Sequence, residues 1–159
     1  MSTRVGIGYD SHRFSAGRPL RLGGVTVPHT HGLAGHSDGD VALHAVVDAL
    51  LGAIAVGDIG TFFPDDDPQW KGADSTRFVK KVVETLQQDK VSVQQVDVTI
   101  VAERPKLADK IGAMRAATAK ALGVEMSAVS IKAKTNEGMG WIGRGEGIAA
   151  IAVATVNAG

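Results

Sequence analysis

The sequence predicts a two-layer α+β fold in a single domain, residues 1–159. Three observations predict it. The chain has 159 residues, a length typical of one domain, and no repeat, linker or low-complexity segment divides it. At least four segments have the alternating or β-branched pattern of strands, and three have the apolar spacing of helices. A sheet covered by helices is the simplest arrangement of these elements.

The strand predictions begin near the N-terminus. Residues 4–9 alternate and are rich in glycine and β-branched side chains, so we expect a strand with close neighbours. Residues 20–27 predict a hairpin, because Gly23 and Gly24 stand between two alternating runs. Later strands are expected at residues 91–102, 129–135 and 147–156.

The first two helices follow from apolar spacing and capping residues. Residues 40–56 are apolar almost all round, which is typical of a buried helix, and Ser37 and Asp38 are suitable N-terminal caps. An amphipathic helix is expected to follow a cap at Asp74 or Ser75 and to end near residue 89.

The third helix is expected to begin at Pro105, which suits a first helical turn, and to end at Gly123. Residues 57–73 separate the first two helices and are expected to form a loop without regular structure. Loops of that length are often functional, so this segment is a candidate part of a site.

The composition excludes several classes of protein. With no cysteine there is no disulfide, no thiolate metal site and no cysteine nucleophile. The 17 basic and 17 acidic side chains cancel and aromatic residues make up only 4%, so no nucleic-acid partner is expected. Residues 41–56 are too short and too polar to span a membrane, and the N-terminus does not resemble a signal peptide. We therefore expect a cytoplasmic protein with no membrane partner.

Three residues are candidate metal ligands. Asp10 and His12 are two apart on an expected strand and therefore share a face, although a strand-end turn is the commoner reason for such a pair. His44 forms a polar stripe with Asp40 and Asp48 on the apolar helix. Burying such groups is costly unless they are paired or bind a metal, and a solvated or capping stripe is the alternative. One carboxylate and two imidazoles are a common donor set for catalytic zinc.

Two other segments are candidate phosphate sites. His36 and Ser37 precede the buried helix, whose N-terminal amides favour an anion, although the segment is also a plain helix cap. Residues 132–138 combine lysines with Glu137, and a lone carboxylate often holds Mg²⁺ beside substrate phosphates. The alternative for that segment is a solvated turn. No P-loop, dinucleotide-binding or G-x-S-x-G motif is present.

Five blocks of the sequence together resemble the 2-C-methyl-D-erythritol 2,4-cyclodiphosphate synthase family. They occur in family order over essentially the whole chain, at residues 10–12, 36–44, 57–60 with 63–65, 132–137 and 143–147. The resemblance implies a mixed four-stranded sheet with helices on one face, and a homotrimer whose core is formed by three sheets. It also implies active sites between subunits, and a stand-alone synthase rather than one fused to a cytidylyltransferase.

The implied reaction belongs to non-mevalonate isoprenoid biosynthesis. The 2-phosphate of 4-diphosphocytidyl-2-C-methyl-D-erythritol 2-phosphate attacks the β-phosphate, and CMP leaves. The resemblance assigns one Zn²⁺ per site to Asp10, His12 and His44, and Mg²⁺ or Mn²⁺ to Glu137. Asp40 and Asp48 are then expected to support the ligand histidine.

The resemblance also assigns substrate contacts and two residues that position the reacting groups, His36 and Thr135. The expected substrate-binding residues are His36, Ser37, Asp58, Ile59, Gly60, Phe63, Pro64, Asp65, Ala102, Pro105, Lys106, Leu107, Ala108, Ala133, Lys134, Thr135, Trp141 and Arg144. A central trimer cavity is expected to be lined by Tyr9, Trp141, Arg144 and Glu146. Tyr9 and Trp141 stand where many relatives have phenylalanine.

Two other functions fit the same residues. A metal-dependent phosphohydrolase would use the same ligands but release no cyclic diphosphate. A trimeric metabolite-binding protein with a structural metal would release no CMP. Analysis of the products separates all three.

Overall fold

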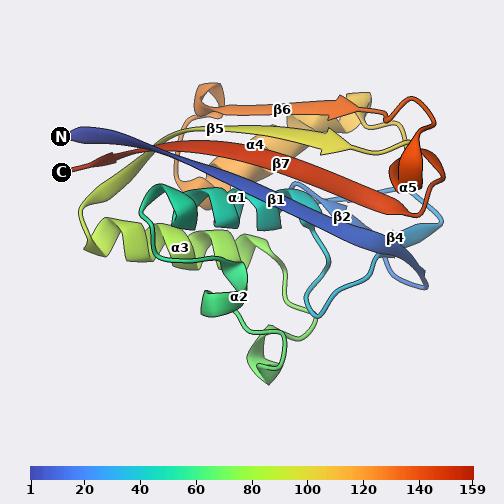
Figure 1. Ribbon diagram of the computed structural model, residues 1–159, viewed down its shortest axis with the longest axis horizontal. Helices are drawn as coiled ribbons and strands as arrows, with labels where there is room; N and C mark the ends of the chain where they lie inside the picture. The colour runs from blue at the N-terminus through green and yellow to red at the C-terminus, as the bar shows by residue number, and fades with distance from the viewer.

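A mixed five-stranded sheet, in the order β4-β1-β7-β5-β6, forms one layer of the computed structural model, which describes residues 1–159 (Figure 1). Only β5 and β6 run parallel. The strands are β1 (Ser2–Ala16), β4 (His31–Leu33), β5 (Val91–Val101), β6 (Val129–Lys134) and β7 (Gly147–Ala158). The two-layer α+β prediction is confirmed, but the sheet has five strands rather than the four that the family resemblance implies. The added strand, β4, is three residues long and pairs only with the end of β1, so it has no alternating pattern of its own.

Strand β1 is much longer than predicted and carries the first metal-ligand candidates. It pairs with β7 from Ser2 to Arg13, well past the predicted end at residue 9. The predicted hairpin is confirmed as β2 (Leu20–Leu22) and β3 (Val25–Val27). Its turn residues, Gly23 and Gly24, have φ of 60° and 81°, a backbone conformation that favours glycine.

The buried helix α1 (Val41–Ala53) packs directly on β1, and glycine makes this approach close. A Cβ atom at Gly6 or Gly8 would collide with the main-chain oxygens of Ala49 and Ala45. The helix backbone can therefore lie against the strand without intervening side chains. This contact brings residues of α1 next to residues of β1 that are far away in sequence.

The cap of α1 differs from the prediction. Asp40, rather than Ser37 or Asp38, is the N-cap, and its Oδ1 accepts from the Leu43 amide at 3.1 Å. The same carboxylate accepts from the amides of Gly23 and Gly24 at 2.9 and 2.8 Å. Burial raises the pKa of Asp40. Asp40 thus joins the hairpin turn to the start of α1.

The other helices are α2 (Ile59–Phe62), α3 (Thr76–Gln88), α4 (Ile111–Leu122) and α5 (Gly140–Gly143), with 3₁₀ turns η1 (Pro68–Trp70), η2 (Ala108–Lys110) and η3 (Met126–Ala128). The short elements α2 and η1 lie within residues 57–73, so the prediction of a loop without regular structure there was partly wrong. Asp74 Oδ1 accepts from the Thr76 amide at the start of α3, as expected of a cap. None of the helices combines the length and apolar character needed to cross a bilayer.

The third helix starts later than predicted and ends where predicted. Pro105 lies in the loop after β5, and α4 begins only after the turn η2. Gly123 ends the helix in the left-handed conformation with φ of 70°. A proline is compatible with a first helical turn but does not require one, so the pattern did not settle the start.

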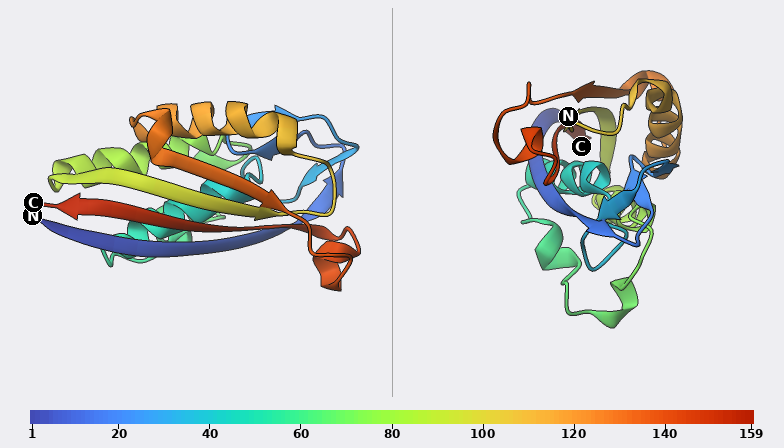
Figure 2. Two further views of the ribbon diagram at one scale, coloured as in Figure 1. Left: turned by 90° about the horizontal axis from the view of Figure 1, so that it is seen from above. Right: turned by 90° about the vertical axis from the view of Figure 1, so that its right-hand side faces the viewer.

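One face of the sheet is covered and the other is open (Figure 2). The covered face packs against α1, α3 and α4 in a cluster of 38 buried apolar residues. On β7, Ala150, Ala152 and Ala154 are fully buried, whereas the intervening Ile151 and Val153 are 39% and 37% exposed. Exposed apolar side chains continue on β1 at Val5, Ile7 and Tyr9.

Candidate metal centre and flanking pockets

Asp10, His12 and His44 converge, and their donor atoms all lie within 4.8 Å of one another. His12 Nε2 is 2.8 Å from Asp10 Oδ2 and 3.2 Å from His44 Nδ1, and His44 Nδ1 is 3.1 Å from Asp10 Oδ2. Donor atoms around a tetrahedral zinc ion, with bonds of about 2.0–2.1 Å, lie about 3.3 Å apart. The three donors therefore have nearly the mutual spacing that such an ion requires.

The ring of His12 is held by a main-chain carbonyl. Its Nδ1 lies 2.6 Å from Ala34 O, an atom that can only accept, so Nδ1 carries the proton. In the neutral ring, Nε2 then directs its lone pair at Asp10 and His44. The network thus selects the tautomer that a metal ligand needs.

The ring of His44 is held by hydroxyl groups. The Ser75 hydroxyl donates to Asp38 Oδ1 at 2.5 Å, so its oxygen accepts from His44 Nε2 at 2.9 Å. A second hydroxyl, Ser37 Oγ, lies 3.1 Å from the same nitrogen. His44 Nδ1 therefore also presents a lone pair to the cluster.

The two carboxylates expected to support His44 bind main-chain amides instead. Asp40 caps α1 and holds the hairpin turn. Asp48 Oδ1 accepts from the Ile59 amide at 2.7 Å, which fixes the start of α2. Burial raises the pKa of Asp48. The groups that contact the outer ring nitrogen of His44, Nε2, are instead the hydroxyls of Ser37 and Ser75.

The electrostatics of the cluster favour a cation at its centre. Burial alone would raise the pKa of Asp10, but hydrogen bonds with His12 and His44 hold it well below its usual value. Burial lowers the pKa of His12, but the hydrogen bond to Asp10, the negative charge of Asp10 and the bond to Ala34 O together outweigh burial and raise it. Three acceptor atoms facing one point are compatible only with a proton or a metal ion there. One oxygen and two imidazole nitrogens suit zinc.

A cavity of about 200 Å³, which we call the metal cavity, opens beside these donors. Its other lining residues are Gly35, His36, Ser37, Ile59, Gly60, Phe63, Asp65, Trp70 and Phe78. The structure thus brings most of the expected erythritol and phosphate contacts to the donors. Asp58 and Pro64 are next to lining residues in the chain but do not line the cavity. Asp58 Oδ1 accepts from the Thr61 amide at 3.0 Å, and this bond lowers its pKa.

Trp70 and Phe78 are cavity residues that the sequence analysis missed. With Phe63 they form an aromatic cluster, with ring centroids 4.6 Å apart for Phe63–Phe78 and 5.0 Å apart for Phe63–Trp70. Ala34 and Ser75 were also missed as partners of the metal-ligand candidates. A main-chain carbonyl has no sequence signal, and the position of Ser75 before an amphipathic segment predicts only a helix cap.

A second cavity, of about 490 Å³, lies between the end of β6 and the loop from β5 to α4, and we call it the β5–α4 pocket. It is lined by Ala102, Glu103, Pro105, Lys106, Leu107, Ala108, Ile111, Ala133, Lys134 and Thr135. The pocket therefore contains every expected substrate-binding residue from Ala102 to Thr135. Glu103 and Ile111 are additions.

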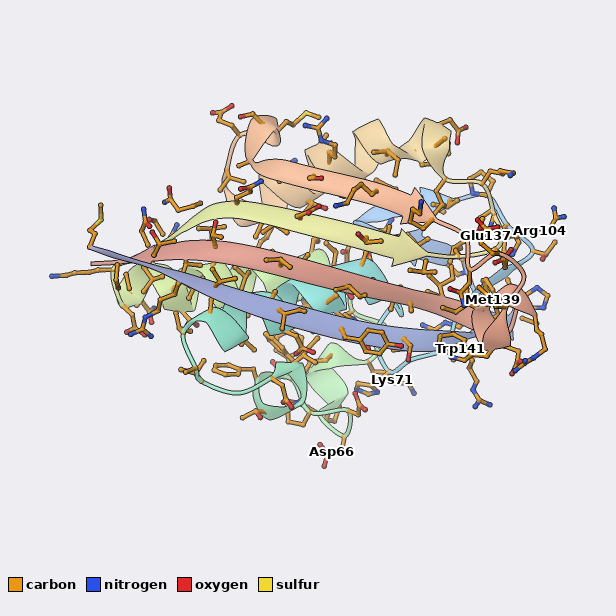
Figure 3. The ribbon with its side chains drawn as sticks, turned by 45° about the horizontal axis from the view of Figure 1, so that its top comes forward. Asp66, Lys71, Arg104, Glu137, Met139 and Trp141 are labelled. Atoms are coloured by element: carbon orange, nitrogen blue, oxygen red, sulfur yellow. The ribbon has the colours of Figure 1, made fainter.

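Glu137 is separate from the zinc candidates. It is exposed and lies on the turn after β6, near Arg104 and Met139 (Figure 3). The loop beside the metal cavity, which carries Asp66 and Lys71, lies elsewhere in the same view. Glu137 has a φ of 55°, and its amide donates to Thr135 Oγ1 at 3.2 Å. Within one chain, Glu137 does not belong to a group of three or more acidic or histidine side chains with converging donor atoms, unlike Asp10, His12 and His44.

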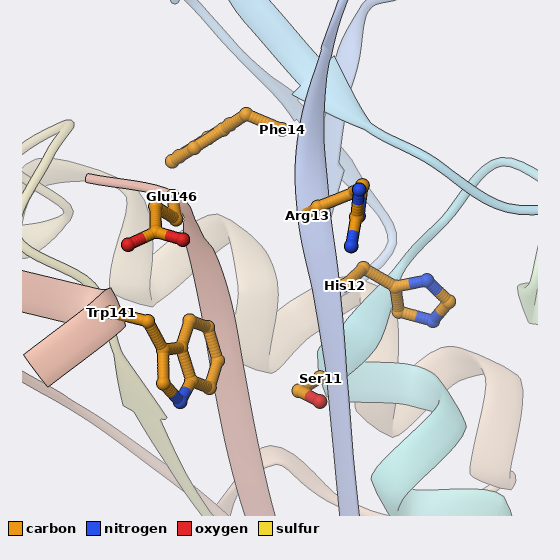
Figure 4. A pocket seen from close by; sticks show the side chains of 6 residues that line it. All are labelled: Ser11, His12, Arg13, Phe14, Trp141 and Glu146. Atoms are coloured by element: carbon orange, nitrogen blue, oxygen red, sulfur yellow. The ribbon is translucent and has the colours of Figure 1, made fainter. Parts of the chain in front are cut away.

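A third cavity, of about 520 Å³, contains two of the residues expected in the trimer cavity. Trp141 and Glu146 line it on one side of β1, and the ring of His12 points to the other side (Figure 4). Arg144 donates to Glu146 Oε2 at 2.6 Å. Tyr9 lies farther along β1 on the open face of the sheet and is 57% exposed.

The fold and the converging donors first define a class: a small α+β protein with a candidate metal centre beside a polar cavity. The YgbB family model matches residues 3–157, and the chain belongs to this family.

The relatives and solved structures agree with this membership. A protein of Salinibacter ruber named 2-C-methyl-D-erythritol 2,4-cyclodiphosphate synthase is 55% identical over 153 residues, covering 96% of this chain and 98% of its own. A solved synthase structure, described as the bound form with CDP, is 35% identical and covers 97% of this chain and 100% of that one, with a TM-score of 0.89. The bifunctional IspDF of Campylobacter jejuni is 37% identical, with a TM-score of 0.95, and covers 99% of this chain and 43% of that one.

The Ser75 hydroxyl should increase the zinc affinity of the metal centre. Ser75→Ala removes the nearer of the two hydroxyls at His44 Nε2, the one that Asp38 orients to accept, so zinc affinity is expected to fall by about 10- to 100-fold. Competition with a chromogenic chelator measures this. Ser127→Ala, at an exposed serine in η3, is the matched control and should bind zinc like the wild type. Equal zinc affinity in the Ser75 and Ser127 variants would contradict the assignment.

Proposed function

We propose that this chain is a single-domain cytoplasmic enzyme that converts 4-diphosphocytidyl-2-C-methyl-D-erythritol 2-phosphate to 2-C-methyl-D-erythritol 2,4-cyclodiphosphate and CMP. It would serve non-mevalonate isoprenoid biosynthesis. One observation carries the proposal: in a chain of this family, the donors Asp10, His12 and His44 converge on a cavity that includes His36 and Ser37.

The substrate contains its own nucleophile. An oxygen of the 2-phosphate forms a bond to the β-phosphorus, the bond from that phosphorus to the α–β bridging oxygen breaks, and CMP leaves with the electron pair. No protein nucleophile is needed, so catalysis consists of positioning and charge stabilisation.

Asp10, His12 and His44 would hold Zn²⁺, and Glu137 would hold Mg²⁺ or Mn²⁺. When bound, these ions supply Lewis-acid stabilisation of the charge on the diphosphate. The donor set fits zinc because each histidine has its second nitrogen committed to a hydrogen bond that leaves the other free. Protons compete for the same lone pairs.

The two pockets would bind different ends of the substrate. The metal cavity, at about 200 Å³, suits a group the size of a phosphorylated tetritol, and the β5–α4 pocket, at about 490 Å³, suits a nucleoside. Thr135 Oγ1 accepts from the Glu137 amide, so its hydroxyl proton is free to bind a phosphate oxygen. Lys106 has no side-chain partner within the chain and supplies a positive charge beside the nucleotide.

A homotrimer would join the two halves of the site. The metal cavity and the β5–α4 pocket share no lining residue, so one copy could present the first and its neighbour the second. The open sheet face supports this, because Val5, Ile7 and Tyr9 are 63%, 69% and 57% exposed. A continuous apolar face of this kind marks an interface. Trp141, Arg144 and Glu146 would then lie near the symmetry axis.

A charge on that face should prevent assembly. Ile7→Glu is expected to convert a trimer to monomers and to lower turnover by about 100-fold or more, because a desolvated carboxylate destabilises the interface. Light scattering gives the mass and CMP release gives the rate. Gln87→Glu, on the exposed side of α3, adds the same charge elsewhere and should leave both unchanged. A wild-type mass corresponding to a monomer would contradict the trimer.

The deciding experiment is incubation with the cytidylyl substrate, Zn²⁺ and Mg²⁺, followed by ³¹P NMR. A cyclic diphosphate and equimolar CMP are expected. CMP with a linear phosphate product would identify a phosphohydrolase. Binding without any CMP would identify a metabolite-binding protein.

A further inference from the structure

Glu103 connects two parts of the candidate site that the sequence analysis treated separately. It follows β5, between residues of the β5–α4 pocket, and is itself part of that pocket's lining. Its Oε1 accepts from the amides of Asn136 and Gly138 at 2.7 and 3.2 Å. These amides lie on either side of Glu137, the candidate ligand for Mg²⁺ or Mn²⁺. The side chain of Glu103 therefore connects the turn at Glu137 to the loop after β5 that lines the β5–α4 pocket, which we call the nucleotide loop.

The turn requires such a partner. Glu137 and Gly138 have φ of 55° and 74°, and the left-handed conformation is unfavourable for a non-glycine residue such as Glu137. In this conformation the amides at 136 and 138 converge on one point, a concavity that favours an anion. The carboxylate of Glu103 occupies it. An acceptor that satisfies two amides stabilises the turn against its more relaxed conformations.

The conformation of this turn determines what two other residues can do. The direction of the Glu137 side chain follows from its main-chain dihedral angles. The bond from the Glu137 amide to Thr135 Oγ1, at 3.2 Å, also depends on them, and it leaves the Thr135 hydroxyl proton free. A shift of the turn would therefore move the cation ligand and a phosphate contact together.

We infer that Glu103 is a positioning residue of the reaction: its carboxylate locks the Glu137 turn to the nucleotide loop, so that nucleotide binding and cation binding are coupled. The inference rests on the proposed function. The Oε1 atom of Glu103 is committed to the amides of Asn136 and Gly138. It acts through Glu137, Thr135 and the loop residues next to it.

The test compares Glu103→Ala with Glu103→Gln. The alanine variant removes the acceptor, so the Kd for CDP and the Mg²⁺ concentration for half-maximal turnover should each rise by about tenfold or more. The glutamine variant keeps an amide oxygen that can accept from both amides, so both quantities should stay within about threefold of the wild type. Zinc content should not change in either.

Glu125→Ala, at an exposed glutamate before η3, is the matched control and should behave as wild type. Where the alanine variant fails to fold, Glu103→Met preserves length without the acceptor and replaces it. Wild-type CDP affinity and Mg²⁺ midpoint in the acceptor-free variant would overturn the inference, as would equal losses in the glutamine and alanine variants. Calorimetry with CDP and Mg²⁺ needs no turnover, so it tests Glu103 even if the wild type makes no cyclic product.

Discussion

His44→Ala should abolish zinc binding and lower the rate of CMP release by about 1,000-fold or more, because it removes one of three donors and the charge stabilisation that they organise. The side chain is 8% exposed and contacts both other donors. Its loss would leave Asp10 and His12 as a pair, which is too few ligands for tight binding. Metal analysis after dialysis and a CMP assay measure the two effects.

Two further variants make the His44 result specific. Asp10→Asn is nearly isosteric and removes only the anionic donor, so it should also lose zinc while keeping its fold. His29→Ala removes an exposed imidazole outside the cluster and should retain zinc and activity. Unchanged zinc content in the His44 variant would refute the ligand assignment, whatever its activity.

Glu137→Gln should lower turnover by about 100-fold and make it nearly insensitive to added Mg²⁺ or Mn²⁺, with zinc still bound. The substitution keeps the shape of the side chain and removes the charge that a hard cation prefers. Turnover measured against Mg²⁺ concentration, with zinc quantified in the same sample, separates the two ions. Because Glu137 is exposed, the fold should be unaffected.

Glu125→Gln removes the charge of another exposed glutamate and should keep the wild-type response to Mg²⁺. If Glu137→Gln keeps that response too, Glu137 is not the second metal ligand. The result also differs from that expected for Glu103→Ala, in which Glu137 is still present and higher Mg²⁺ should restore turnover.

Much of the fold could be predicted because its signals are local. The apolar character of residues 40–56 predicts the buried helix, which spans Val41–Ala53 in the structure, and the Gly23–Gly24 pair predicts the hairpin. The wrong predictions concern ends and short elements: the cap at Asp40, the start of α4 and strand β4. Those depend on which partner each segment finds. Asp40 is the cap because the hairpin turn supplies two further amides to its carboxylate.

The candidate site divides in the same way. Asp10, His12 and His44 could be proposed as donors from residue type and from the family resemblance, and the nucleotide residues from the resemblance alone. The sequence offered no basis for proposing three other groups: the hydroxyl of Ser75, the carbonyl of Ala34 and the carboxylate of Glu103. Each acts through a contact with a residue distant in sequence, and none has a spacing that marks it.

By itself, then, the sequence determined the kinds of chemistry available: oxygen and nitrogen donors for a metal, charged groups for phosphates, and no thiol chemistry. Only the tertiary structure decided that the donors meet. Because Gly6 and Gly8 lack side chains, the backbone of α1 lies directly on β1, and His44 reaches Asp10 and His12 across the contact. Spacing along a chain specifies which residues share a face of one element. Which faces meet depends on packing between elements.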